Sequence, residues 1–530
     1  MVALHSNAAL LNSDGATVVL QGQSMAHGNV LLNGWQLSLD SWWTLDVPFY
    51  AVATAILGVG PADLFVVPAV IGALVVVAAV ALVRAGRRGA ASAAGAALVL
   101  AVLVFPSHML AFMLLAGPVH QSTVLYSLVA FACLRRNRLG VGFALAIVVL
   151  AAGLLGDLQM LAYGVLPLVA AGLAAMLRTR NARAGAIPLA AALASGALAF
   201  AVRGVVDLVG GFEIGPGNTF ASAHQMLDNF GRLPAALGGL LGVVPGPYGS
   251  GGVPPALLAV HVVPAALLGA ALALAAVRLV RAAARREKGA GSAATGARSA
   301  EPEPWRVDDL LLFAALGSIG TFVTLSRNAN PHFARYLTAA VVAAAVLAGR
   351  ELTRRLQART GEEAPTATAA DADADVDANR GRRRRAALGF GAAVTACFAA
   401  GSLLQLTRPV PPETASGLVR FLEDHHLTRG IGDFWLASIS TVESHGRVVV
   451  RPVVPGADGV PEAYNKGLVP GWFAGVPFRF LVVTGLGEDP AMRRGAVTAF
   501  GEPSRSYSVD GVTVLVWAHP IHVTSYQPPQ

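Results

Sequence analysis

The stretch LFVVPAVIGALVVVAAVALV at residues 64–83 contains no charged side chain, and the basic joint RAGRR follows it at residues 84–88. An α-helix rises about 1.5 Å per residue, so about 20 apolar residues cross the roughly 30 Å hydrocarbon core of a bilayer. We therefore predict that this stretch is a membrane-spanning helix that ends at a positively charged joint.

The same pattern recurs along the 530-residue chain, in which 55% of the residues are apolar and only 13% are charged. An average soluble domain carries about 25% charged residues, so this composition excludes an ordinary soluble enzyme, a coiled coil and a disordered chain. The predicted fold class is mainly α, a polytopic transmembrane helix bundle. About ten spanning segments are expected, at residues 64–83, 91–115, 119–134, 139–156, 158–177, 186–202, 254–279, 308–325, 334–349 and 386–406.

The basic residues are concentrated at a few joints between these segments. The joints hold 25 of the 39 lysines and arginines, at residues 84–88, 135–138, 178–183, 278–306 and 350–385. They are every second connection, which the positive-inside rule places in the cytoplasm. Topology therefore explains the net charge of +8, and no nucleic-acid partner is needed. The chain start, the loop 203–253 and everything after residue 407 are predicted outside, with the protein in the plasma (inner) membrane.

In this topology the N-terminus lies outside the membrane, so the start of the chain must be exported. Met1–Ser13 is neither a signal peptide nor long enough to span a bilayer. The stretch Val2–Leu11 has the composition of a helix end, so we expect a first helix upstream of this start. A chain that inserts with its N-terminus outside is the alternative.

Three regions are expected. Residues 1–63 form a first outer loop with surface-lying helices, and residues 64–406 form the bundle with cytoplasmic linkers at 280–306 and 350–385. Residues 407–530 form an extracytoplasmic α/β domain. In that domain, helices are predicted at 418–425 and 432–444, and strands at 447–454, 478–484 and 511–517.

The first 63 residues hold the most informative polar positions. Asp14, Asp40, Asp46 and His27 occur there with three tryptophans, and without any lysine or arginine. An aromatic belt of Trp35, Trp42 and Trp43 at headgroup depth, with aspartates as helix caps, is one interpretation. The aromatic-belt interpretation explains Asp14 less well, because Asp14 stands at the start of an amphipathic stretch directly after the expected first helix.

This layout resembles the first extracytoplasmic loop of the GT-C glycosyltransferases, including the protein mannosyltransferase and aminoarabinose transferase types. The matching elements are Asp14, Gly28-Asn29 with Gly34-Trp35, Ala334-Arg335-Tyr336-Leu337, and Gly432-Asp433-Phe434-Trp435-Leu436-Ala437. The resemblance implies transfer of a sugar, of the hexosyltransferase type, from a polyprenyl-phosphate carrier at the outer face. The acceptor would be a cell-envelope glycan, lipid or protein. Asp14 would be the general base, although Gly15 follows where the family often has a second acidic residue.

Other candidate residues lie at the same predicted face. Asp157, the second catalytic candidate, stands in a short turn. A carboxylate at membrane depth needs a wet cavity or a partner, and it can also cap the helix that begins at Leu158. Asp40, Asp46 and His27 are assigned to substrate binding, with loop support as the alternative for the aspartates. Arg327, His332 and Arg335 form a cationic cluster for phosphate, or snorkel to lipid headgroups.

Two rivals stay open. A transporter or lipid flippase would show an internal repeat and ionisable residues at the bilayer midplane, which the sequence lacks. A non-catalytic GT-C-like assembly protein would share the layout without the chemistry. The motifs require no cofactor, although they are compatible with a divalent metal ion at the site.

Overall fold

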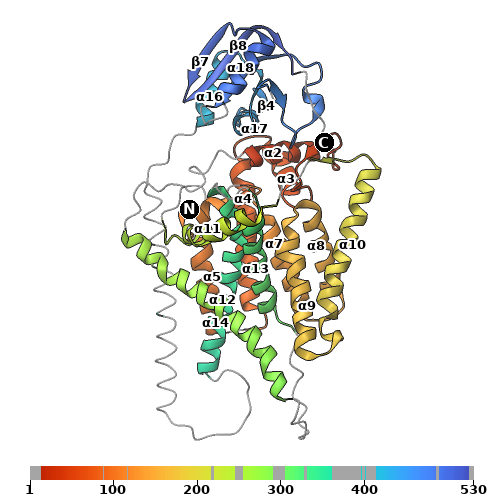
Figure 1. The fold of residues 1–530 in the computed structure, drawn as a ribbon, viewed down its shortest axis with the longest axis vertical. Coiled ribbons are helices and arrows are strands. Elements are labelled where there is room, and N and C mark those ends of the chain that lie inside the picture. The colour runs from red at the N-terminus through yellow and green to blue at the C-terminus, as the bar shows by residue number, and fades with distance from the viewer. Residues whose placement is uncertain are drawn as a thin grey trace.

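The computed structural model describes residues 13–87, 89–115, 117–215, 220–244, 255–289, 305–326, 331–360, 414–456, 458–484 and 489–523, with single helical residues at 389, 396 and 400. Two helices and a short strand precede the bundle: α2 (Ser13–Ala26), β1 (Gln36–Leu37) and α3 (Val47–Leu57). The sheet domain sits over one end of the bundle, against α2 (Figure 1). We call this the domain end.

The bundle contains long and short helices in sequence order. They are α4 (Asp63–Arg84), α5 (Ala90–Val104), α6 (His108–Leu115), α7 (Gln121–Leu134), α8 (Val141–Gly156), η1 (Leu161–Val165), α9 (Leu166–Thr179), η2 (Ala182–Gly185), α10 (Ala186–Leu208), α11 (Ala223–Leu241), α12 (Pro255–Gly289), α13 (Val307–Thr324), η3 (Pro331–Leu337) and α14 (Thr338–Thr360). Strand β2 (Glu213–Ile214) follows α10 and pairs in parallel with β1.

Within the described residues, six helices are long and apolar enough to cross a membrane. A seventh span results if α5 and Met109–Leu115 count as one, although they are bent by 86°. The prediction of about ten spans was therefore too high. Helices α7 and α8 have only 14 and 16 residues, which is about 21 and 24 Å. The tenth expected segment, 386–406, lies almost wholly outside the described residues.

Side chains on α4 show why such a helix suits a bilayer. Val66, Val70, Leu74 and Val77 are 38–64% exposed and lie on one face of the helix. The opposite face is buried through residues such as Ile71, which is 2% exposed. An apolar face left exposed along a whole helix is stable in lipid and unfavourable in water. The apolar helices thus give the chain the character of a membrane protein.

Two of the three tryptophans of the first loop are buried, which does not fit the interpretation of an aromatic belt at headgroup depth. Trp35 and Trp43 are 3% and 9% exposed. The Trp35 Nε1 atom donates to Ser24 Oγ at 3.2 Å, and Trp43 Nε1 donates to the Val30 carbonyl at 2.7 Å. These indoles pack the loop onto the bundle because burying a large ring with its N–H satisfied stabilises more than leaving it exposed.

The sheet domain is built around a six-stranded mixed sheet of order β5-β4-β3-β6-β8-β7. Strands β3, β4 and β6 are parallel, and the others are antiparallel to their neighbours. The elements are α16 (Thr414–Asp424), β3 (Arg429–Asp433), α17 (Phe434–Glu443), β4 (Val449–Pro455), β5 (Pro461–Ala463), η4 (Pro470–Trp472), β6 (Phe478–Thr484), α18 (Asp489–Phe500), β7 (Arg505–Val509) and β8 (Val512–Ile521).

The helices and strands predicted for this domain are confirmed at 418–425, 432–444, 447–454, 478–484 and 511–517, within a few residues at each end. Strand β3 was not predicted, because its sequence RGIGD has a single large apolar residue. Gly430 is needed there, since a Cβ atom at this position would collide with the Phe480 ring of β6.

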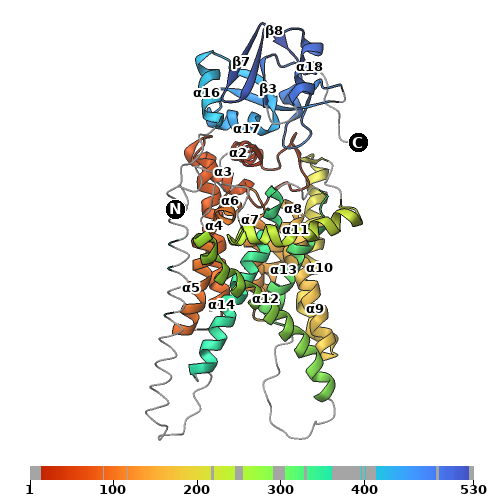
Figure 2. The ribbon, with the colours of Figure 1, turned by 60° about the vertical axis from the view of Figure 1, so that its left-hand side comes forward.

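Helix α17 joins the sheet domain to α2, and the two helices lie side by side in both views (Figure 2). Ser13 Oγ donates to the Phe434 carbonyl at 2.5 Å, and Thr17 Oγ1 donates to Ser438 Oγ at 3.1 Å. Asp433 caps α17 by accepting from the Trp435 N–H at 2.8 Å. The carboxyl end of β3 therefore faces the N-terminal turn of α2.

Candidate functional site

A carboxylate and a guanidinium meet at the domain end of the bundle. Asp14 lies in the first turn of α2, and Arg335 lies in η3, just before α14. The Asp14 Oδ2 atom is 3.8 Å from an Arg335 guanidinium nitrogen. Their side chains are 27% and 25% exposed, so both charges remain accessible from outside the packed core.

The surroundings of Asp14 raise the pKa of its carboxyl overall. Burial raises the pKa of its carboxyl above the ordinary value of 3.8, and the positive charges of Arg335, His120 and Lys466 lower it only in part. A carboxyl group with a raised pKa is a better proton acceptor than an ordinary aspartate, as general base catalysis requires.

His120 and Asp157 form a buried pair beneath this position. The His120 Nδ1 atom lies 2.7 Å from Asp157 Oδ2, and both side chains are at most 3% exposed. Thr123 also donates to Oδ2, and the Gln159 N–H donates to Oδ1 at 2.8 Å. Asp157 thus combines the capping bond expected for the following helix with a buried partner.

The charges of this pair support each other. Burial by itself would lower the pKa of His120, but the Asp157 charge and hydrogen bond outweigh it and raise the pKa. Burial would likewise raise the pKa of Asp157, and the His120 charge with the three hydrogen bonds lowers it overall. Both shifts favour a protonated histidine beside an ionised carboxylate.

Asp40 lies against this pair. One carboxylate oxygen of Asp40, one of Asp157 and a ring nitrogen of His120 all lie within 4.8 Å of one another. Burial and the neighbouring Asp157 charge raise the pKa of Asp40 to about 7. A group with this pKa gains and loses a proton near neutral pH, which is the property of an acid–base catalyst.

Asp46 is the fourth aspartate of the site, where the charge of Asp157 acts on it. It is 1% exposed, accepts a hydrogen bond from Ser122 Oγ, and has its pKa raised to about 7 by burial. Its Oδ1 atom is buried without a hydrogen-bond partner in the described part of the chain. Asp46 and Asp157 are the most buried of the four, at 1% and 0% exposed.

Aromatic rings and a π-helical turn hold Arg335 in place. Its guanidinium lies 5.3 Å from the centre of the Tyr336 ring and 5.7 Å from that of Phe333. The Tyr336 carbonyl accepts from Tyr163 Oη at 2.9 Å. Tyr163 lies in the π-helical turn η1, next to Pro167, whose missing N–H disrupts regular α-helical bonding.

The residues around Asp157 suit a divalent metal ion in donor type. Two carboxylates and one imidazole are ligands that Mn²⁺ and Zn²⁺ accept. Their spacing within 4.8 Å also fits. However, Asp157 Oδ2 already accepts from His120 and Thr123, so an ion bound to that oxygen would replace one of these bonds.

The structure places the predicted site residues in two groups. Asp14, Asp40, Asp46, Asp157 and Arg335 come together at the domain end. Of the other three, only His27 has a described side chain, and it lies apart. His27 is exposed, bonds to the Gln23 carbonyl at 2.7 Å, and lies about 20 Å along α2 from Asp14; Arg327 and the side chain of His332 lie outside the described residues.

Two members of the site were missed as site residues in the sequence. His120 lacks any metal-ligand spacing, and its only signal is a position in the turn before α7, where its φ of 69° is left-handed. Lys466 lies in a segment without a motif, between β5 and β6. Its charge reaches Asp14 only because the sheet domain folds back onto α2.

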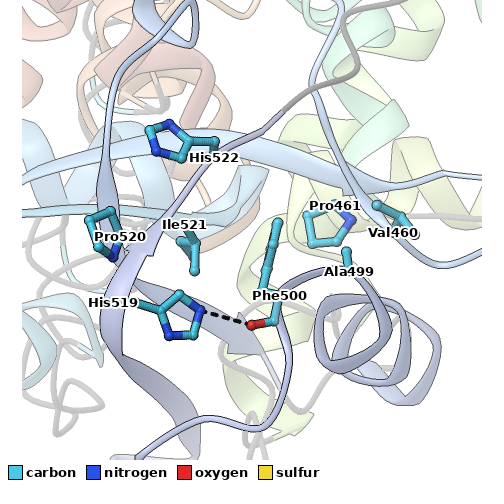
Figure 3. A pocket seen from close by; sticks show the side chains of 8 residues that line it. All are labelled: Val460, Pro461, Ala499, Phe500, His519, Pro520, Ile521 and His522. Atoms are coloured by element: carbon cyan, nitrogen blue, oxygen red, sulfur yellow. Dashed lines mark hydrogen bonds between the residues drawn. The ribbon is translucent and has the colours of Figure 1, made fainter.

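A separate cavity of about 320 Å³ lies in the sheet domain (Figure 3). It is lined by apolar residues and by His519 and His522, and His519 bonds to the Phe500 carbonyl at 3.0 Å. It lies at the Ile521 end of β8, about 20 Å along the sheet from the end that contacts α2. No carboxylate, lysine or arginine belongs to its lining, so it does not share the chemistry of the Asp14 site.

Comparisons with known proteins do not assign the chain to a family. No family model matches the chain, and no curated protein is similar to it. The structure is similar to the crystal structure of ArnT from Cupriavidus metallidurans in the apo state, with 14% sequence identity and a TM-score of 0.49. The alignment covers 97% of this chain and 95% of that chain. A likeness at this level assigns neither a family nor an activity.

Proposed function

We propose that the protein is an integral membrane glycosyltransferase that moves a sugar from a polyprenyl-phosphate carrier to an acceptor at the outer face of the membrane. The observation that carries the proposal is the convergence of four aspartates with Arg335 and His120 at one end of an apolar bundle. The proposed acceptor is a cell-envelope glycan, lipid or protein.

The proposed reaction requires a general base for the acceptor hydroxyl and positive charge beside the phosphate. Glycosyl transfer passes through a transition state with oxocarbenium character, in which the acceptor hydroxyl loses its proton. We assign Asp14 as the base that accepts this proton, with Asp40 as the second titratable carboxyl of the site. A divalent ion held by Asp40, His120 and Asp157 would supply positive charge for the departing phosphate.

Arg335 is assigned to the phosphate of the donor. A guanidinium presents a planar fork of donors that matches two phosphate oxygens. Its aromatic neighbours fix the orientation of the fork, and a quarter of the side chain stays exposed. Its contact with Asp14 would bring the donor phosphate beside the proposed base.

Arg335→Ala is expected to raise the KM for a polyprenyl-phosphate sugar by about ten- to a hundredfold, because a charge-assisted bond to phosphate is lost. Arg335→Lys should recover part of this loss. The matched control is Arg203→Ala, since Arg203 is also 25% exposed and stacks over Phe212 at 4.5 Å, but pairs with the exposed Asp207. Equal KM values for Arg335→Ala and Arg203→Ala would refute the assignment.

The proposed sidedness is supported by where the basic joints meet. Arg87 donates to the Arg350 carbonyl at 2.9 Å, and Arg350 and Arg178 pair with Asp308 and Asp309 at the start of α13. The α9 and α14 ends that carry these arginines lie opposite the sheet domain (Figure 2). The arginines thus gather at one end of the bundle, and the four aspartates of the site lie at the other.

Reporter fusions test this orientation. Fusions after residues 88, 138, 183, 290 and 365 should report the cytoplasm, and fusions after 230 and 420 should report the exterior, as the positive-inside rule requires. Alkaline phosphatase and green fluorescent protein activities in whole cells provide the two readouts. A cytoplasmic signal from the 420 fusion would place the sheet domain and Asp14 on the wrong side for the proposed reaction.

A further inference from the structure

Lysine is rare in this chain. Only two of the 39 basic residues are lysines, Lys288 and Lys466, and the rest are arginines. Lys466 follows β5 in the segment that leads from the sheet domain down to the first loop. An ammonium group on a flexible stem differs from a guanidinium, because it acts as a compact point charge with three donors. Lys466 is the single lysine in the sequence of the sheet domain.

The backbone around Lys466 is anchored to the domain end of the bundle. The Gln36 N–H donates to the Leu468 carbonyl at 2.8 Å, and the Gly467 N–H donates to the Gln36 carbonyl at 2.7 Å. Gly467 has a φ of +65°, and a Cβ atom there would lie 2.6 Å from Thr17 Cγ2. Glycine is therefore required at 467, and it lets this segment pack directly against α2.

This anchoring brings Lys466 near the proposed base. Thr17 follows Asp14 by three residues, so both lie on the same side of α2 within one turn. Lys466 is half-buried, and its Cγ atom lies 3.8 Å from where a Cβ atom of residue 215 would stand. The positive charge of Lys466 lowers the pKa of Asp14, together with the charges of Arg335 and His120. Positive charges from three separate parts of the fold therefore act on one carboxylate.

We infer that Lys466 is a substrate-binding residue that the sheet domain contributes to the site, where it binds the phosphate of the lipid carrier together with Arg335. This inference rests on the proposed function. It also gives the sheet domain a part in the reaction, because the domain must stay docked on α2 for Lys466 to reach the site.

The test is lipid binding to the purified full-length protein in nanodiscs. The probes are a labelled polyprenyl monophosphate, the uncharged polyprenol of the same length, and inorganic phosphate alone. Lys466→Met keeps most of the stem and removes the charge, Lys466→Arg restores a cation, and Arg493→Met removes an exposed cation from α18 of the same domain. Circular dichroism checks that each variant folds.

Lys466→Met should weaken binding of polyprenyl monophosphate by about ten- to a hundredfold and leave polyprenol binding unchanged. Lys466→Arg should recover part of the loss, and Arg493→Met should match wild type. Inorganic phosphate should compete weakly with the lipid, since it lacks the chain. A purely structural role for Lys466 would weaken both lipids equally.

The outcomes separate this inference from the function on which it rests. If wild type prefers the phosphate lipid to polyprenol and Lys466→Met binds it equally well, Lys466 is not a phosphate ligand, and the proposed function stands. If wild type shows no preference for the phosphate lipid, the proposed function fails, and the inference fails with it.

Discussion

Asp14→Asn is expected to lower the rate of sugar transfer by about 10²- to 10⁴-fold, the usual cost of losing a general base. The amide keeps the size of the side chain and most of its hydrogen bonding, but it cannot accept the acceptor's proton. Because Asp14 is a quarter exposed at the start of α2, the substitution should leave folding intact. The measurement is the initial rate of transfer from a labelled polyprenyl-phosphate sugar by reconstituted protein.

Two matched variants sharpen this experiment. Asp228→Asn changes an exposed aspartate of α11, whose Oδ2 atom lies 3.4 Å from the exposed His224 ring, and should keep full activity. Asp40→Asn tests the other titratable carboxyl, whose pKa is about 7. Full activity in Asp14→Asn with no activity in Asp40→Asn would transfer the role of base to Asp40 and overturn the assignment made here.

Asp157→Asn is expected to destabilise the folded protein by about 3–5 kcal/mol, because it breaks a buried ion pair and leaves His120 without its charged partner. The free energy of unfolding in detergent micelles measures this effect. The control is Asp207→Asn, which breaks an exposed pair with Arg203 and should cost no more than about 1 kcal/mol. Similar losses in the two variants would show that the His120 pair is not a buried ion pair.

The stability from this pair also depends on pH in a defined direction. The pKa of His120 is raised from 6.5, so its share is fully present below that pH and is lost as pH rises through the folded value. The pKa of Asp157 is lowered from 3.8, so its share is present above that pH and is lost as pH falls through the folded value. The pair should therefore stabilise the fold most between about pH 3.8 and pH 6.5. The double variant His120→Gln/Asp157→Asn should lose this pH dependence of stability.

Removing the Asp157 charge has a second consequence, for Asp40. The neighbouring negative charge is one cause of the raised pKa of Asp40, so Asp157→Asn should move that pKa below about 7. Any limb of the pH–rate profile that reports Asp40 should shift to lower pH in this variant.

Local pattern was enough to predict most of the fold. Apolar runs such as 64–83 and the alternating strands of the sheet domain carry their structure in neighbouring residues. The span count was too high because composition does not reveal where a helix ends or bends. Helix α7 ends after 14 residues, and the α5–α6 pair turns by 86°. Strand β3 depends on Phe480, which is distant in sequence, and could not be predicted from RGIGD alone.

The site was predictable only in part, for a related physical reason. Asp14, Asp157 and Arg335 stand at helix starts or in short turns, where a charged residue between apolar segments is unusual enough to be noticed. His120 gains its role from Asp157 across a tertiary contact. Lys466 gains its position from the docking of Gly467 on Thr17. Neither contact can be predicted from neighbouring residues in the sequence. Only the structure therefore identifies His120 and Lys466 as members of the site.

The most direct test of the central claim follows a fluorescent polyprenyl-phosphate sugar in proteoliposomes that contain the purified protein and a membrane extract as the source of acceptor. A panel of pentose and hexose donors should include one from which the protein releases polyprenyl phosphate while the sugar enters the acceptor. Asp14→Asn liposomes should release none above background. Movement of the intact donor between leaflets without release would instead show a flippase, and the absence of both release and movement with every donor would contradict a role as a glycosyltransferase.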